Sequence, residues 1–334
     1  MRYRHTFRIF GIVTLAAVYF LILVGSIVRA SGAGMGCPDW PKCFGQWIPP
    51  TNVSQLPPDY QKIYAARGYA DTQFNVVKTW TEYINRLVGM TVGLLVFGTL
   101  LLSFSYWKKD KLTVGLCAAA FFLTGFAGWL GKYVVDNNLL PITVTLHMAT
   151  ALLIVTTLIW ALTRAQRDRF ASLDESALSR IRLFLMICLA LSLIQIFMGT
   201  QVRQTVDTIA ATYGEEARSI WAKQLGTIFY IHRSFSILVL LANGVLAYQV
   251  WRLARTSTGM VRAVTADVAI IVLEIITGAS LYYLGFPAFL QPVHLLLATL
   301  MFGVQLFLLM ALRYSQAKRD AESQSMGIQA AAHP

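Results

Sequence analysis

The sequence has little charge. Only 13% of its residues are Asp, Glu, Lys or Arg, whereas 56% are hydrophobic. Soluble globular proteins carry about 25% charged residues, so this composition excludes an ordinary soluble protein. The apolar residues lie in long runs, and a helix that crosses a bilayer needs about 20 of them. The sequence therefore predicts an all-α membrane protein.

Eight runs are long enough to span a bilayer. The first is followed by a charged loop rather than by a small-residue cleavage site, so we interpret it as a retained helix and not as a signal peptide. The predicted spans cover about residues 9–28, 83–105, 112–132, 142–163, 183–202, 224–250, 268–285 and 290–312.

The net charge of +12 does not indicate a nucleic-acid partner, because most basic residues lie in alternate loops between the spans. Examples are Lys108 to Lys111 and Arg164 to Arg169. Excess Lys and Arg in short loops marks the cytoplasmic side of a membrane. Both termini are therefore predicted to be cytoplasmic, in a bacterial inner membrane. The polar, Ala-rich segment 314–334 is predicted to be a disordered cytoplasmic tail.

The polar residues repeat along the chain. Two four-helix halves, 9–163 and 183–313, follow from this repeat, and each has an even number of spans. The halves should therefore have the same orientation, as in membrane proteins built from parallel repeats. The same spacing separates Asn85 from His232 and His147 from His294. The matching segments are GSIVR (25–29) with GTQVR (199–203), and YINR (83–86) with YIHR (230–233).

Histidine is scarce, with five residues, yet His147, His232 and His294 all fall inside predicted spans. An ionisable residue there is costly and indicates a function. His232 and His294 are predicted at matching depths on two helices of one bundle, where two imidazoles can ligate a haem iron. A zinc site would need two more N or S ligands, which are not nearby. The alternative is that each histidine only hydrogen-bonds a neighbouring helix.

The two halves differ at their polar positions. Arg203 and Arg233 suit haem propionates, or else they snorkel to the interface. The first half keeps His147 but has Asn85 where the second has His232. Glu82 lies three residues before Asn85 on the same helix face and suits proton transfer; the alternative is an interfacial carboxylate paired with Arg86. The second half thus suits an electron-transfer haem and the first a reactive site.

Of the four cysteines, Cys37 and Cys43 lie in the long outer loop, 29–78. This loop is predicted on the oxidising side of the membrane, where disulfides persist. A bridge there can brace the loop or, if it is easily reduced, pass electrons. Cys117 and Cys188 lie within spans and are predicted to be packing residues. Glu274 lies inside the seventh span and receives no assigned role.

Four segments together resemble the haem A synthase family, over about residues 10–313. They are RASG (29–32), CPDWP (37–41), GQWIP (45–49) and EYINR (82–86). The resemblance implies eight transmembrane helices in two four-helix halves. It also implies an oxidoreductase that converts the ring-D methyl group of haem O to a formyl group. The product would be haem A for terminal oxidases.

The resemblance also assigns residues. His232 and His294 would bind a haem b cofactor, and Cys37 and Cys43 would form the loop disulfide. The first half would hold haem O, and its assigned residues are His147 as iron ligand, Glu82 as the acid, and Asn85, Arg86 and Arg29 as substrate contacts. The family usually has Glu-x-x-His-Arg, whereas this chain has Asn85 at the histidine position. We favour an active site with one histidine and an open coordination position over a loss of activity.

Two other functions are compatible with the sequence: a bis-histidine membrane cytochrome b that transfers electrons, and a haem transporter. Asn85 and Glu82 make the two halves unequal, which favours the oxidoreductase. That activity implies four kinds of partner besides the lipid bilayer. They are the substrate haem O, a haem O synthase that delivers it, an electron donor such as a quinol, and possible further copies of the chain in a homo-oligomer.

Overall fold

Eight helices are long and apolar enough to cross a membrane in the computed structural model, which describes residues 2–70, 72–170 and 173–332. No β-strand occurs in that described part. Helices are expected because a spanning segment must satisfy its backbone hydrogen bonds internally. The all-α membrane fold is thereby confirmed. The helices are α1 (Arg2–Ala30), α3 (Val76–Ser103), α4 (Lys111–Asp136), α5 (Pro141–Arg164), α6 (Glu175–Tyr213), α8 (Thr227–Leu253), α9 (Thr258–Tyr283) and α10 (Leu290–Ala332).

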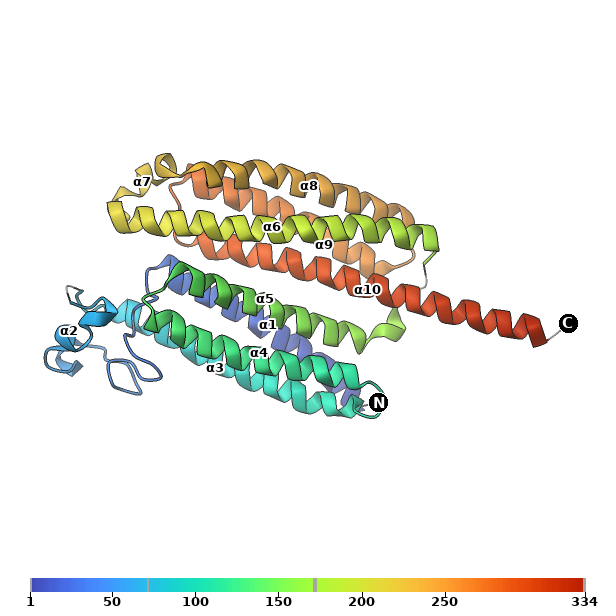
Figure 1. The fold of residues 1–334 in the computed structure, drawn as a ribbon, viewed down its shortest axis with the longest axis horizontal. Coiled ribbons are helices and arrows are strands. Elements are labelled where there is room, and N and C mark those ends of the chain that lie inside the picture. The colour runs from blue at the N-terminus through green and yellow to red at the C-terminus, as the bar shows by residue number, and fades with distance from the viewer. Residues whose placement is uncertain (1, 71, 171–172, 333–334) are drawn as a thin grey trace. The chain divides into compact units, whose positions relative to one another are not determined.

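The chain divides into two compact units. The first comprises Met1–Leu158 and Pro287–Leu296, and the second comprises Ile159–Phe286 and Leu297–Pro334. In the first unit α3 packs against both α1 and α4, and in the second α8 packs against both α6 and α9 (Figure 1). The borders between the units fall inside α5, between α9 and α10, and inside α10.

Several helices extend beyond the predicted spans, and three of these extensions, in α3, α9 and α6, bear on the polar residues. Helix α3 begins at Val76 rather than near 83, because the Asn75 side chain caps it by accepting a 3.0 Å hydrogen bond from the Lys78 N–H. Helix α9 begins at Thr258 rather than near 268. Helix α6 passes residue 202 and ends at Tyr213, before Gly214 with a φ of 77°. Glu82 therefore lies inside α3, and Asp267 inside α9.

The C-terminal segment also differs from its prediction. Helix α10 runs from Leu290 through Ala332, so the helix continues into segment 314–334, for which the sequence predicted disorder. The segment contains five Ala and three Gln, which have high helix propensity. Its last two residues lie outside the described part of the chain.

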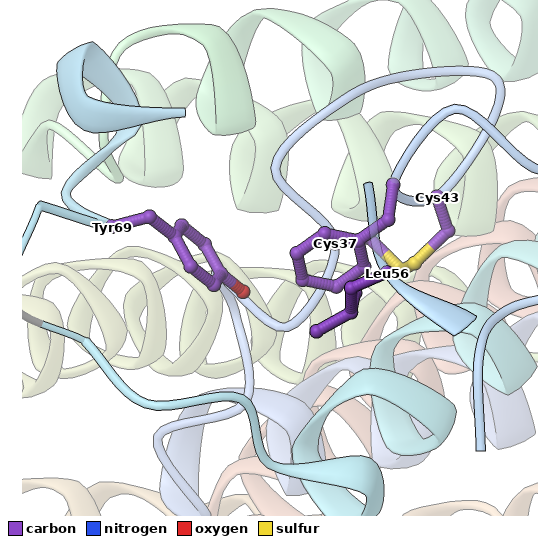
Figure 2. Close-up of a cluster of buried hydrophobic side chains, with 5 residues drawn as sticks. Cys37, Cys43, Leu56 and Tyr69 are labelled. Atoms are coloured by element: carbon purple, nitrogen blue, oxygen red, sulfur yellow. A yellow bond between two sulfur atoms is a disulfide. The ribbon is translucent and has the colours of Figure 1, made fainter. Parts of the chain in front are cut away.

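The outer loop folds around Phe44, which is only 1% exposed. The ring of Phe44 makes edge-on contacts with four other rings, those of Tyr60, Tyr64, Tyr69 and Phe74. Cys37, Cys43 and Leu56 complete this buried cluster. Figure 2 shows the disulfide close to Leu56, with Tyr69 on the other side of the cluster. The loop thus has a hydrophobic core of its own, and the helical pieces in its described part are η1 (Val53–Gln55), α2 (Tyr60–Ile63) and η2 (Ala65–Arg67).

Polar contacts fix the path of the loop. The Asp39 carboxylate accepts hydrogen bonds from the N–H groups of Phe44 (2.6 Å) and Gly45 (2.8 Å). The Tyr69 hydroxyl donates to the Met35 carbonyl at 2.5 Å. Burial, with a smaller contribution from the nearby Glu82 charge, raises the pKa of Tyr69. Tyr69 therefore stays a neutral donor at physiological pH.

The loop also makes a close backbone contact with the first turn of α3. A Cβ atom on Gly36 would lie 2.3 Å from the Lys78 carbonyl oxygen and 2.9 Å from the Thr79 nitrogen. The Thr79 hydroxyl donates to the Gly36 carbonyl at 2.9 Å. Only glycine fits here, because the obstructing atoms belong to the backbone of a helix.

We predict that Gly36→Ala separates the loop from α3 and destabilises the protein by about 1–3 kcal/mol, the usual cost of overpacking. Limited proteolysis and thermal unfolding of the detergent-solubilised protein would measure the effect. The matched control is Gly93→Ala, because nothing lies within 4 Å of a Cβ atom at Gly93. Equal protease resistance of the two variants would contradict the prediction.

Candidate functional site

Glu82 lies at the junction of α3 and the outer loop and is only 3% exposed. Its Oε1 atom accepts a hydrogen bond from Arg86 Nη2 at 2.5 Å, one helical turn further along α3. Its Oε2 atom accepts one from the Cys37 backbone N–H at 2.8 Å. The expected alternative, a carboxylate paired with Arg86, is therefore what the structure shows. The pair neutralises a charge that would otherwise be buried alone.

Arg86 attaches the loop to α3. Its Nη1 atom donates to the backbone carbonyls of Asp39 (2.7 Å) and Lys42 (3.0 Å), and its Nη2 atom donates to the Cys37 carbonyl (3.1 Å). A guanidinium group presents five donors in a fixed plane, which suits such convergent contacts. The side chain that pairs with Glu82 therefore also holds the loop that carries the cysteines.

Cys37 and Cys43 are joined by a disulfide, with Cα atoms 4.9 Å apart. The predicted bridge is thus confirmed. Both residues are fully buried, and thiol–disulfide exchange requires access to the sulfur atoms. A thiol in solution reaches this bridge only when the loop opens, which favours the bracing role over electron transfer.

Two of the four residues predicted to bind the substrate in the first half have unsatisfied atoms. Asn85 Oδ1 and His147 Nδ1 are both buried and have no hydrogen-bond partner. The Ala127 backbone lies within hydrogen-bonding range of the His147 ring. Glycines lie next to both side chains: a Cβ atom on Gly25 would be 3.7 Å from Asn85 Oδ1, and one on Gly131 would be 3.6 Å from His147 Cε1.

The second unit has the same kind of contact at the matching position. A Cβ atom on Gly199 of α6 would lie 3.4 Å from His232 Cε1 of α8, as Gly25 of α1 faces Asn85 of α3. The Gln195 side chain donates to the His232 carbonyl at 3.1 Å. In each unit, a glycine thus leaves space beside a polar residue that sequence analysis assigned to a haem.

The two arginines assigned to haem propionates have protein partners. Arg203 forms a 2.5 Å ion pair with Asp207, one turn along α6. The Arg233 guanidinium lies 5.4 Å from the ring centre of Tyr230 and 5.9 Å from that of Phe229. Arg203 thus already binds a carboxylate, whereas Arg233 makes the aromatic contacts expected of an interfacial arginine. Arg29 is half-buried in the last turn of α1.

His294 lies in the first turns of α10, within segment 287–296 of the first unit, whereas His232 belongs to the second unit. Their pairing across one haem iron therefore stays a prediction. Among the described residues, no group of three or more His, Cys, Asp and Glu side chains could hold a metal ion. A haem iron needs only one or two protein ligands. The buried, unpartnered Nδ1 atom of His147 fits such a ligand.

Sequence analysis missed two residues that shape the site. Asp39 fixes the turn at Phe44 and Gly45, and Gly36 allows the loop to approach α3 closely. An Asp ahead of a glycine in a proline-containing segment is a turn signal, so the role of Asp39 could have been predicted from the sequence. The contact of Gly36 with Lys78 could not have been predicted, because it depends on the path of the loop.

The comparisons with known proteins agree with these observations. The sequence model of the COX15-CtaA family, described as cytochrome oxidase assembly protein, matches residues 8–306. Heme A synthase of Shewanella oneidensis is 29% identical over 205 residues, which are 60% of this chain and 58% of that relative. Heme A synthases of Brucella suis and Brucella abortus are each 24% identical over 311 residues, or 84% of both chains.

We predict that Arg86→Ala opens the outer loop, because it removes the contacts with Asp39, Lys42 and Cys37 and leaves Glu82 as an unpaired buried carboxylate. Breaking such a pair costs about 3–5 kcal/mol when both groups are fully buried, and about 3 kcal/mol is expected here. The measurement is the rate at which mild reductant and an alkylating reagent label Cys37 and Cys43, followed by mass spectrometry.

The control for this prediction is Lys62→Ala, since the Lys62 side chain is 81% exposed and pairs only with the exposed Asp59. Labelling should accelerate at least about tenfold in Arg86→Ala, in line with a stability loss above 1.4 kcal/mol, and remain unchanged in Lys62→Ala. An unchanged rate in both variants would show that Arg86 does not hold the loop.

Proposed function

Because the chain belongs to the COX15-CtaA family of cytochrome oxidase assembly proteins, we propose that it is a haem A synthase, an oxidoreductase that acts on haem O. The observation that carries this proposal is the family match over residues 8–306, together with relatives named heme A synthase over 84% of the chain. The reaction is the conversion of the ring-D methyl group to a formyl group. Two successive hydroxylations, each consuming O2, two electrons from the donor and two protons and releasing one water, would give a geminal diol, which loses water to become the aldehyde.

The substrate haem would lie in the first unit. The buried atoms His147 Nδ1 and Asn85 Oδ1 lack protein partners, and a buried polar atom without a partner is costly unless a ligand satisfies it. His147 would ligate the iron of haem O, with its ring orientation set by the Ala127 backbone. Asn85 is a far weaker iron ligand than imidazole, so one coordination position would stay open.

Glu82 would manage protons at the methyl group. It lies three residues before Asn85, so both side chains occupy the same face of α3. Arg86 and the Cys37 N–H hold both carboxylate oxygens, which fixes the position of Glu82. Glu82 would transfer protons that the hydroxylation of the methyl group consumes, and Arg86 would position it. Arg29, in the last turn of α1, would bind a propionate.

A haem b in the C-terminal half would be ligated by His232 and His294 and would supply electron transfer when bound. The repeat supports this assignment, because His232 has the same glycine contact as Asn85. Arg203 would bind a propionate. Its ion pair with Asp207 shows that a carboxylate can reach its guanidinium group. Arg233 would be the second propionate contact.

The cellular setting follows from charge and chemistry. The distribution of Lys and Arg supports cytoplasmic termini and a disulfide loop on the outer side of a bacterial inner membrane. A haem O synthase would deliver the substrate, since haem O is too apolar to diffuse freely through water. A quinol or another donor would supply electrons, and further copies of the chain could associate in the bilayer.

The first test is mass analysis of the haems that copurify with the protein when it is expressed with a haem O synthase. We expect haem A in the wild type. In Glu82→Gln, haem O or a hydroxylated intermediate should accumulate, with haem A lowered about 100-fold, within the range typical of general acid–base catalysis. Asp59→Asn is the control, because the Asp59 side chain is 68% exposed. Unmodified haem b alone in the wild type would instead indicate an electron-transfer cytochrome.

The second test separates the two haem sites. We expect His232→Ala to lose the resident haem b, measured as haem-to-protein ratio and as the reduced-minus-oxidised absorption spectrum. His147→Ala should retain that haem and lose haem A formation. The opposite pattern would reverse the assignment of the two halves. Loss of all haem in both variants, with normal thermal stability, would show that the sites are not separate.

A further inference from the structure

A second group of buried polar side chains lies in the second unit, and the proposed reaction does not use it. Asn243 of α8, Asp267 of α9 and Gln305 of α10 are all between 0% and 1% exposed. Charged and amide side chains are rare inside membrane-spanning helices, and an ionisable one indicates a functional site by default. The three residues come from three different helices, so they form a polar layer inside the unit.

An apolar cluster lies next to the polar layer and fixes which way its side chains point. Val239, Ile271 and Met301 pack together, one from each of the same three helices. Asn243 and Gln305 follow their cluster residues by four positions, and Asp267 precedes Ile271 by four. Residues four apart share a helix face. The three polar side chains therefore point into the interior of the unit, one turn from the apolar cluster.

The hydrogen bonds of this layer leave one feature unexplained. Gln305 Nε2 donates to Asn243 Oδ1 at 3.0 Å, and Asn243 Nδ2 donates to the Val239 carbonyl at 2.9 Å. Gln305 Oε1 and both oxygens of Asp267 are buried without a partner. The Gln305 side chain is the amide that faces Asp267. The Gln305 amide lies within hydrogen-bonding range of the carboxylate, yet both Asp267 oxygens and Gln305 Oε1 have no aligned hydrogen-bond donor.

A proton on Asp267 would supply the missing donor. A carboxylic acid has one O–H group, which can donate to Gln305 Oε1 and satisfy two of the unpaired atoms. From α6, the titratable group that faces Asp267 is Cys188, a buried free cysteine. Among the described residues, the polar side chains that α8 and α10 contribute to this layer are the amides of Asn243 and Gln305. No Lys, Arg or His among the described residues pairs with Asp267, so an ionised carboxylate would have no counter-charge.

We propose that Asp267 is a proton-binding site that gains a proton from the cytoplasmic side when an electron enters the haem held by His232. The haem in this inference rests on the proposed function, whereas the buried polar layer rests on the structure. The balance is simple: the electron donor is oxidised, the haem iron gains one electron, and Asp267 takes one proton from water. The proton path is short, because Asp267 lies only about 14 Å along α9 from its first residue, Thr258, at the predicted cytoplasmic end.

The expected coupling has a definite size. His232 and Asn243 lie on the same helix, about 16 Å apart along its axis. At that separation and an effective dielectric constant of about 20, one added electron raises the proton affinity of Asp267 about fivefold. The reduced form therefore holds more of the proton, and the haem midpoint potential falls as pH rises through the titration of Asp267.

The experiment uses the full-length, haem-loaded protein in lipid nanodiscs. Infrared spectroscopy would detect the carbonyl stretch of a protonated carboxylic acid, identified by its shift in D2O, both at rest and as a reduced-minus-oxidised difference. Redox titration at several pH values would give the midpoint potential. The test variant is Asp267→Asn, whose amide can still donate to Gln305 Oε1 and so preserves the fold. The control is Asp174→Asn, an exposed acid at the start of α6.

Support would be a carboxylic acid band and a pH-dependent potential in the wild type, both lost in Asp267→Asn and both kept in Asp174→Asn. An unchanged potential–pH slope in Asp267→Asn would overturn the proposal. So would a sodium-dependent gain in thermal stability that vanishes in Asp267→Asn, since it would show a metal cation in place of the proton. Absence of any reducible haem would overturn the proposed function and the redox link together, while the resting infrared band would still decide whether Asp267 binds a proton.

Discussion

The ion pair between Glu82 and Arg86 is the contact on which the outer half of the first unit depends. The loop that follows α1 has an aromatic core of its own but few regular elements, so its attachment to α3 rests on a small number of polar contacts. Arg86 makes several of them and also compensates the buried charge of Glu82. One guanidinium group therefore holds both the acid proposed for catalysis and the disulfide loop. A substitution that displaces one of them is expected to displace the other.

Most of the fold could be predicted from hydrophobicity, because a bilayer requires long apolar runs and permits few charges. The ends of the helices could not be predicted in this way. Helix α3 begins before its apolar run because the Asn75 side chain caps its first turn. Helix α6 continues past its apolar run because Val206 and Ile209 maintain a buried face. Helix ends depend on capping and on contacts outside the membrane, which hydropathy does not describe.

The candidate site was predictable where it depends on spacing within one helix. Glu82, Asn85 and Arg86 fall on one face of α3 by periodicity alone. Contacts that depend on the path of a loop could not be predicted, and those of Arg86 with Asp39 and Lys42 are examples. Asp267 was passed over for a different reason. The predicted span began one residue after it, and its neighbours in the polar layer, Asn243 and Gln305, are single amides in apolar runs. They form no visible pattern until three helices are packed together.

The close approach of Gly36 to Lys78 and Thr79 has a consequence for how relatives of this protein can exchange parts. The loop and the first turns of α3 are complementary backbone surfaces, and Arg86 adds a third point of contact. A crossover between two homologous genes within this region would combine a loop from one parent with a helix start from the other. Functional recombinants should therefore inherit residues 31–86 as a block, and their junctions should fall either within α1 or beyond the third turn of α3.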